Sequence, residues 1–228
     1  EEIIEILTEN FSTTKECDVL ISSVVPELTK TVLKFFQKKN QVKLFDYNYF
    51  TNFYDLGELN YKTMGTDRVV VNIATLDIYG DNLLIFDLGT AITLDVIKEG
   101  KYINGLIFPG LRLLRNSLIT GTSQLNTFQF VKLHPKNTCL TTTAQLNDGI
   151  ILGLLGTINQ YIKQNKEHFN KTAKVILTGG DIIYLEENLG KEKLSELIDS
   201  NYIIDSDLMY KGLYKILNNW TDRWKQKT

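Results

Sequence analysis

Three short segments of this chain carry residue types that could do chemistry together. GTDR at Gly65–Arg68 places a carboxylate beside a guanidinium, just before a helical pattern of apolar residues. DLGTAITLD at Asp87–Asp95 begins where an apolar run ends, and its small residues and backbone amides could approach a phosphate there. NGLIFPG follows at Asn104–Gly110. Phosphoryl transfer needs a carboxylate that holds the attacking hydroxyl, together with amides or cations on the transferred oxygens.

Two aspartates in these segments each have two interpretations from the residues alone. Asp67 could take the proton of an attacking hydroxyl, or it could be a helix N-cap, a role that aspartate often fills. The two roles are compatible. Asp87 ends an apolar strand, where its charge is costly unless a cation or amide groups face it. It is therefore either a cation ligand or a turn aspartate that accepts backbone amides.

The order of the segments resembles the type III pantothenate kinases, which carry GxDR, then DxGTAxTxD, then GGxIxPG. SSVVPELT at Ser22–Thr29 and TGGD at Thr178–Asp181 are similar to two further segments of that family, so the resemblance covers most of the chain. It implies transfer of the γ-phosphoryl group of ATP to pantothenate, the first step of coenzyme A biosynthesis. It also implies Mg²⁺ and a monovalent cation, potassium or ammonium, as cofactors, and a homodimer.

The resemblance also implies roles for individual residues. Asp67 is the implied catalytic base and Asp87 the implied ligand of the monovalent cation. The implied binding residues are Gly65, Thr66, Asp67, Arg68, Tyr61 and Thr142 for pantothenate, and Gly89, Thr90, Gly179 and Gly180 for ATP. Thr142 is matched by setting Gly149, Gly153 and Gly156 against the family's GxxxGxxG helix. Alternatively, Arg68 forms a surface ion pair, Tyr61 is a core residue, and the glycine pair is a plain strand-to-helix turn.

The chain departs from the family pattern at its start and at two later positions. Members open with a DxGNT hairpin that wraps the ATP phosphates, whereas this sequence opens at Glu1 without one. We expect a hairpin of roughly thirty residues, two or three strands, to be missing. Asn104 replaces a glycine of the pattern, and Ser123 replaces an alanine. The alternative to a kinase is a non-catalytic relative, similar to the Bvg accessory factors of the same family.

The composition narrows the class of protein. With 43% hydrophobic residues among 228, the chain can bury a substantial core. A formal net charge of −2 gives no field that would attract nucleic acid. Cys17 and Cys139 form no CxxC pair, no apolar run approaches the roughly 20 residues of a membrane span, and no signal peptide opens the chain. We expect a cytoplasmic protein with no nucleic-acid partner and no membrane association.

The pattern of apolar residues divides the chain at a turn, Gly80–Asn82. Before it we expect helices over 2–11, 26–38 and after Asp67, and strands within 18–25 and 42–46. After it we expect strands at 83–87, 92–97 and 102–107, then helices at 110–119, 146–164, 191–198 and 208–224 with strands at 174–177 and 203–205. This order matches an RNase H-like domain. The resemblance implies an α/β fold of two such domains, as in actin and sugar kinases, at residues 1–80 (incomplete) and 81–228.

Overall fold

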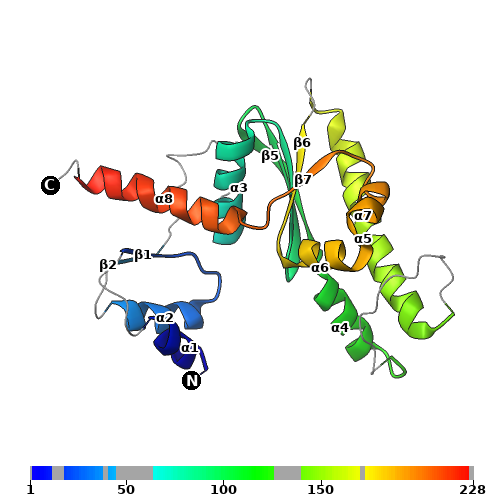
Figure 1. Ribbon diagram of the computed structural model, residues 1–228, viewed down its shortest axis with the longest axis horizontal. Coiled ribbons are helices and arrows are strands. Elements are labelled where there is room, and N and C mark those ends of the chain that lie inside the picture. The colour runs from blue at the N-terminus through cyan, green and yellow to red at the C-terminus, as the bar shows by residue number, and fades with distance from the viewer. Residues whose placement is uncertain are drawn as a thin grey trace. The chain divides into compact units, whose positions relative to one another are not determined.

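The computed structural model describes residues 2–11, 18–37, 41–44, 64–125, 140–169 and 173–225 (Figure 1). Contacts divide the chain into two compact units. The first unit comprises residues 1–74 and 209–228, and the second comprises residues 75–208. The predicted domain ranges, 1–80 and 81–228, remain a prediction. Tyr61 and both cysteines lie outside the described residues. Within the described part of the chain, no helix is both long and apolar enough to cross a membrane.

The first unit begins with α1 (Glu2–Phe11), β1 (Asp18–Ile21), α2 (Pro26–Phe36) and β2 (Gln41–Leu44). The two strands pair in parallel, which requires a crossover connection, and α2 lies within it. Proline suits the first position of α2, because an amide there would have no partner within the helix. Two long helices, α3 (Thr66–Tyr79) and α8 (Leu208–Lys225), run across the boundaries between the units.

The second unit is built on a five-stranded mixed sheet with the strand order β5-β4-β3-β6-β7. Its strands are β3 (Leu83–Leu88), β4 (Ala91–Lys98), β5 (Lys101–Pro109), β6 (Lys174–Thr178) and β7 (Tyr202–Ile204). The first three form an antiparallel meander, β6 is parallel to β3, and β7 is parallel to β6. A meander extended by two parallel strands is the sheet of an RNase H-like domain, as the sequence predicted.

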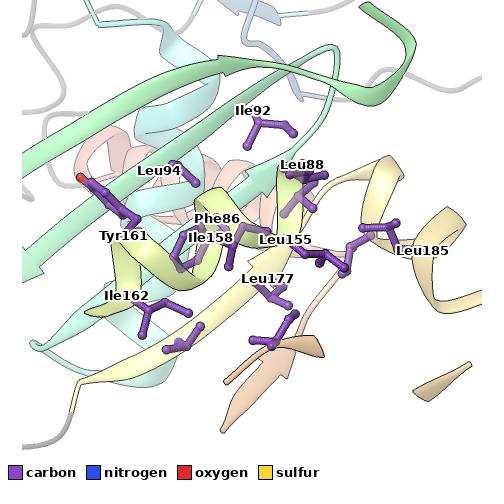
Figure 2. Close-up of a cluster of buried hydrophobic side chains, with 14 of the residues drawn as sticks. Phe86, Leu88, Ile92, Leu94, Leu155, Ile158, Tyr161, Ile162, Leu177 and Leu185 are labelled. Carbon is purple, nitrogen blue, oxygen red and sulfur yellow. The ribbon is translucent and has the colours of Figure 1, made fainter. Parts of the chain in front are cut away.

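The core of the second unit lies between this sheet and the helix α5 (Thr142–Lys166), as Figure 2 shows. Alternate residues of β3 point to the helix side, and the ring of Phe86 meets that of Tyr161 edge to face, with centroids 6.2 Å apart. On the opposite side of β3, Leu83 and Ile85 are also buried. Burial on both sides explains why this strand is an almost continuous apolar run.

Three shorter helices complete the second unit: α4 (Leu111–Gly121), α6 (Gly180–Leu189) and α7 (Lys191–Leu197). The helix α6 was not predicted from the sequence. The helix α5 begins four residues earlier than the predicted start at Leu146, because the hydroxyl of Thr141 accepts a hydrogen bond from the amide of Ala144 at 3.2 Å and caps it. The other predicted helices and strands are confirmed to within a few residues of their ends.

Candidate active site

The carboxyl ends of β3 and β6 bring two of the predicted ATP segments together. We call Asp87–Thr90 the phosphate turn and Thr178–Gly180 the glycine loop. Because the strands are parallel and adjacent, Asp87 pairs with Thr178 in the register of the sheet. The predicted ATP residues of both segments therefore lie at the same edge of the sheet, where ligands of open α/β sheets usually bind.

Gly179 makes the closest approach between these two segments. A β-carbon at this position would collide with the carbonyl oxygen of Leu88 and would lie 2.6 Å from Oδ1 of Asp87. Its φ angle of 91° also lies in the region that favours glycine. Gly180 then begins α6, so the glycine pair is a strand-to-helix turn as well as a point of close approach.

A third segment, Pro109–Leu111, which we call the Pro-Gly loop, packs on the phosphate turn. The amide of Gly110 donates to the carbonyl oxygen of Thr90 at 3.0 Å. A β-carbon at Gly110 would collide with the carbonyl oxygen of Gly89 and would lie 2.7 Å from that of Thr90. The NGLIFPG segment thus lies beside the DLGTA segment at the end of the meander, and glycine is required where they meet.

Asp181, the residue after the glycine loop, links that loop to the Pro-Gly loop. Its Oδ2 accepts a hydrogen bond from the amide of Leu111, the first residue of α4, at 3.0 Å. Burial raises the pKa of the Asp181 carboxyl, while that hydrogen bond and the charge of Arg112 act in the opposite direction. Burial and the neighbouring Asp181 charge raise the pKa of Tyr184. The TGGD motif alone did not predict a role for Asp181, its last residue.

The GTDR segment lies at the start of α3, within the first unit. The helix begins at Thr66, so Asp67 stands inside the first turn and not at the N-cap as one interpretation expected. Its Oδ1 accepts a hydrogen bond from the amide of Arg68 at 2.8 Å. A β-carbon at Gly65 would collide with this same oxygen, so a larger residue at this position would require the Asp67 side chain to move. Arg68 is half-buried.

Ser22 of the SSVVPELT segment contacts the GTDR segment. Its hydroxyl donates to Oγ1 of Thr66 at 3.0 Å, and Thr66 is buried. Val24 lies near the same point, 3.7 Å from a β-carbon built on Gly65. No residue of this segment was predicted to belong to the site. The resemblance of the whole segment to the family could have indicated that it does.

The contacts described so far do not include the remaining predicted site residues. Thr142 is exposed at the first position of α5. Gly149, Gly153 and Gly156 follow on α5, and a β-carbon on any of them would meet no atom within 4 Å. Tyr61 falls outside the described residues. The GTDR group belongs to the first unit, and the phosphate turn, the glycine loop and the Pro-Gly loop belong to the second.

The oxygens near Asp87 are of the kind that hold hard cations. Oδ1 of Asp87 and the carbonyl oxygen of Leu88 both lie against Gly179, and carboxylate and carbonyl oxygens are suitable ligands for such ions. Among the described residues, there is no group of three or more His, Cys, Asp or Glu side chains that could hold a metal ion. The donor atoms at this edge, one carboxylate oxygen and one backbone carbonyl oxygen, are of a type that fits a hard cation.

Comparison with a solved structure defines the fold class. A protein from Campylobacter jejuni described as a Baf-family transcriptional activator matches with a TM-score of 0.59 at 22% identity, over 94% of this chain and 88% of that one. At this identity the similarity shows the fold alone. Together with the strand order, it confirms the predicted α/β fold class.

Comparison with known sequences then gives the family. A family model described as type III pantothenate kinase matches residues 1–164. The type III pantothenate kinase of Fusobacterium nucleatum is 36% identical over 202 residues, 87% of this chain and 75% of that protein. The one from Thermosipho africanus is 33% identical over 211 residues, 89% of this chain and 78% of that protein. The chain therefore belongs to the type III pantothenate kinase family, as the order of its motifs predicted.

Proposed function

We propose that this protein transfers the γ-phosphoryl group of ATP to the primary hydroxyl of pantothenate, the first step of coenzyme A biosynthesis. Its membership of the type III pantothenate kinase family is the observation that carries the proposal. The packing of the phosphate turn, the Pro-Gly loop and the glycine loop at one edge of the sheet supports it, because this is where open α/β sheets bind nucleotides.

ATP would bind at that edge of the second unit. The backbone amides of Gly89 and Thr90 would contact its phosphates. Gly179 and Gly180, which have no side chains, would let the backbone approach the adenosine. Mg²⁺ would neutralise charge on the phosphate oxygens. It is usually coordinated by only one or two protein carboxylates, together with waters and the phosphates themselves.

Pantothenate would bind at the start of α3. Asp67 would hold its primary hydroxyl and accept the proton as the phosphoryl group is transferred. Arg68 would bind the pantothenate carboxylate, since a guanidinium can form two parallel hydrogen bonds to it. Gly65, Thr66, Tyr61 and Thr142 would form the rest of the pantothenate site.

A monovalent cation, potassium or ammonium, would bind at Asp87. The carboxylate and carbonyl oxygens that surround Gly179 support this assignment. The cation would add positive charge near the phosphates, and Asp87 would be its ligand from the protein.

We also propose a cytoplasmic homodimer. Its support is a set of exposed apolar side chains on the second unit, where Ile107, Leu113 and Leu152 are 69%, 48% and 53% exposed. A cavity of about 340 Å³ between α4 and α5 is lined mostly by apolar residues, among them Phe108, Leu118 and Leu146. Exposed apolar surfaces of this kind often mark interfaces. Sedimentation of the purified protein at the mass of a dimer is expected, and a monomer at all concentrations would contradict the proposal.

The proposed reaction is tested by ADP release from the protein expressed from its complete gene. With ATP, Mg²⁺ and potassium present, ADP should form only when pantothenate is added. No response to pantothenate from a folded protein would favour the non-catalytic accessory role instead.

A further inference from the structure

The three segments at the carboxyl edge of the sheet in the second unit form a closed ring of contacts. The phosphate turn holds the Pro-Gly loop through the hydrogen bond from Gly110 to Thr90. The glycine loop packs against the phosphate turn, where Gly179 lies on the carbonyl oxygen of Leu88. Asp181, directly after the glycine loop, closes the ring through its hydrogen bond from Leu111 at 3.0 Å.

The last of these three contacts differs from the others in kind. The first is a bond between backbone atoms, and the second is the close approach of a glycine to a backbone carbonyl. The third is made by a side chain that reaches across 70 positions of sequence. A substitution at Asp181 can therefore open the ring while leaving the backbone of the phosphate turn and its glycines unchanged.

Asp181 also decides what the start of α4 can bind. The first amides of a helix attract anions, because they lack partners within the helix and carry partial positive charge. Here the amide of Leu111 already donates to a carboxylate. The first amide of α4 is thus occupied by a carboxylate of the protein itself and is not available to a phosphate.

We propose that Asp181 is a positioning residue for ATP: by tying the start of α4 to the glycine loop, it fixes the spacing between the segment that contacts adenosine and the turn that contacts the phosphates. This inference rests on the proposed function of the two segments. A binding site whose groups are not held in place must be ordered when the nucleotide binds, and that ordering lowers the affinity, so a ring that sets this spacing should affect nucleotide binding.

A cap that serves only to stabilise α4 would behave differently. Its loss would lower the melting temperature, but it would not change the affinity for a nucleotide. The effect of the Asp181 charge on ADP affinity must also be separated from the effect of its hydrogen bond, because removing a negative charge near the phosphates strengthens ADP binding. The comparison of Asp181→Ala with Asp181→Asn does this, since both lack the charge and only asparagine keeps an oxygen that can accept from Leu111.

The test is the dissociation constant of ADP, measured by calorimetry with Mg²⁺ on the protein expressed from its complete gene. Asp181→Ala should bind ADP about tenfold more weakly than Asp181→Asn, the effect of one lost hydrogen bond in the ring. The KM for ATP should rise in parallel, and the KM for pantothenate should stay at the parental value. If the alanine variant does not fold, Asp181→Ser, whose hydroxyl is too short to reach, replaces it.

Asn159→Ala is the matched control. Asn159 of α5 also bridges two segments, because it accepts from the amide of Asp199 at 3.0 Å and donates to the carbonyl oxygen of Leu197 at 2.6 Å. This control should lower the melting temperature and leave ADP affinity unchanged.

Equal ADP affinity of the alanine and asparagine variants, in a protein whose parent binds ADP, would overturn the positioning role alone. A parent that binds no ADP would overturn the proposed function and this inference with it.

Discussion

At the scale of single residues, the proposed reaction depends most on Asp67, the proposed catalytic base. Its Oδ1 accepts from the amide of Arg68, and asparagine offers an oxygen at the same place. Asp67→Asn should therefore keep nearly the parental melting temperature. Turnover should fall on the order of 10²- to 10⁴-fold, because an amide cannot take the hydroxyl proton. Steady-state kinetics and thermal unfolding measure the two effects.

The same substitution at Asp77, an exposed residue of the same helix, is the control and should retain parental turnover. An Asp67→Asn protein that melts much earlier but keeps most of its activity would show that Asp67 is structural and that the base lies elsewhere.

The proposed role of Asp87 as a cation ligand is tested by replacing potassium with sodium. If Asp87 holds potassium beside the ATP phosphates, activity measured in sodium should be lower than in potassium, mainly through a higher KM for ATP. The variant Asp87→Asn should show no difference between the two salts, because its neutral amide binds cations weakly. Equal KM values for the parent in potassium and in sodium would leave Asp87 as a turn residue only.

At the scale of elements, the fit between the Pro-Gly loop and the phosphate turn can be measured at Gly110. A β-carbon there meets backbone atoms of Gly89 and Thr90, which cannot move aside as a flexible side chain would. Gly110→Ala should lower the free energy of unfolding by about 1–3 kcal/mol, the usual effect of overpacking. Gly121→Ala, at the exposed end of the same helix with no atom within 4 Å, should not destabilise. A parental melting temperature for Gly110→Ala would show that the two loops are not tightly packed.

The contribution of Asp181 to the stability of the fold should also depend on pH. Burial raises the pKa of Asp181 above its value in the unfolded chain, so the folded state binds the proton more tightly. The contribution of this group to stability is then greatest below the unfolded pKa of about 4 and is lost as the pH rises through the folded pKa. Asp181→Asn has no such dependence, and its melting temperature relative to the parent should rise between pH 4 and 7. A difference that is constant over this range would contradict the raised pKa.

The elements show how far the sequence alone could predict this structure. The meander of β3, β4 and β5 was predictable because apolar runs were separated by short turns. The helix α6 was not predicted although Ile182, Leu185 and Leu189 follow a helical spacing, because the two glycines before it have a low helix propensity. The role of Asp181 could not be predicted, because the amide that it binds belongs to a segment 70 positions away and becomes its neighbour only when β3 and β6 pair.

At the scale of the whole molecule, the candidate residues fall into two groups that belong to different units. The GTDR group, with the contact from Ser22 to Thr66, lies in the first unit, and the loops that would bind ATP lie in the second. In the proposed reaction, the first group would bind pantothenate and the second would bind ATP. The family match at residues 1–164 includes the GTDR, DLGTA and NGLIFPG segments, while the glycine loop and Asp181 lie beyond it.

The most direct test of the central claim follows the phosphoryl group itself. The protein expressed from its complete gene is incubated with pantothenate, Mg²⁺, potassium and ATP labelled at the γ-phosphate, and the products are separated. We predict that label appears on pantothenate with the parent and with Asp77→Asn, and that Asp67→Asn lowers its rate of appearance roughly 10²-fold or more. Label that stays on ATP or appears only as inorganic phosphate, in a folded parent that binds ATP, would contradict this prediction.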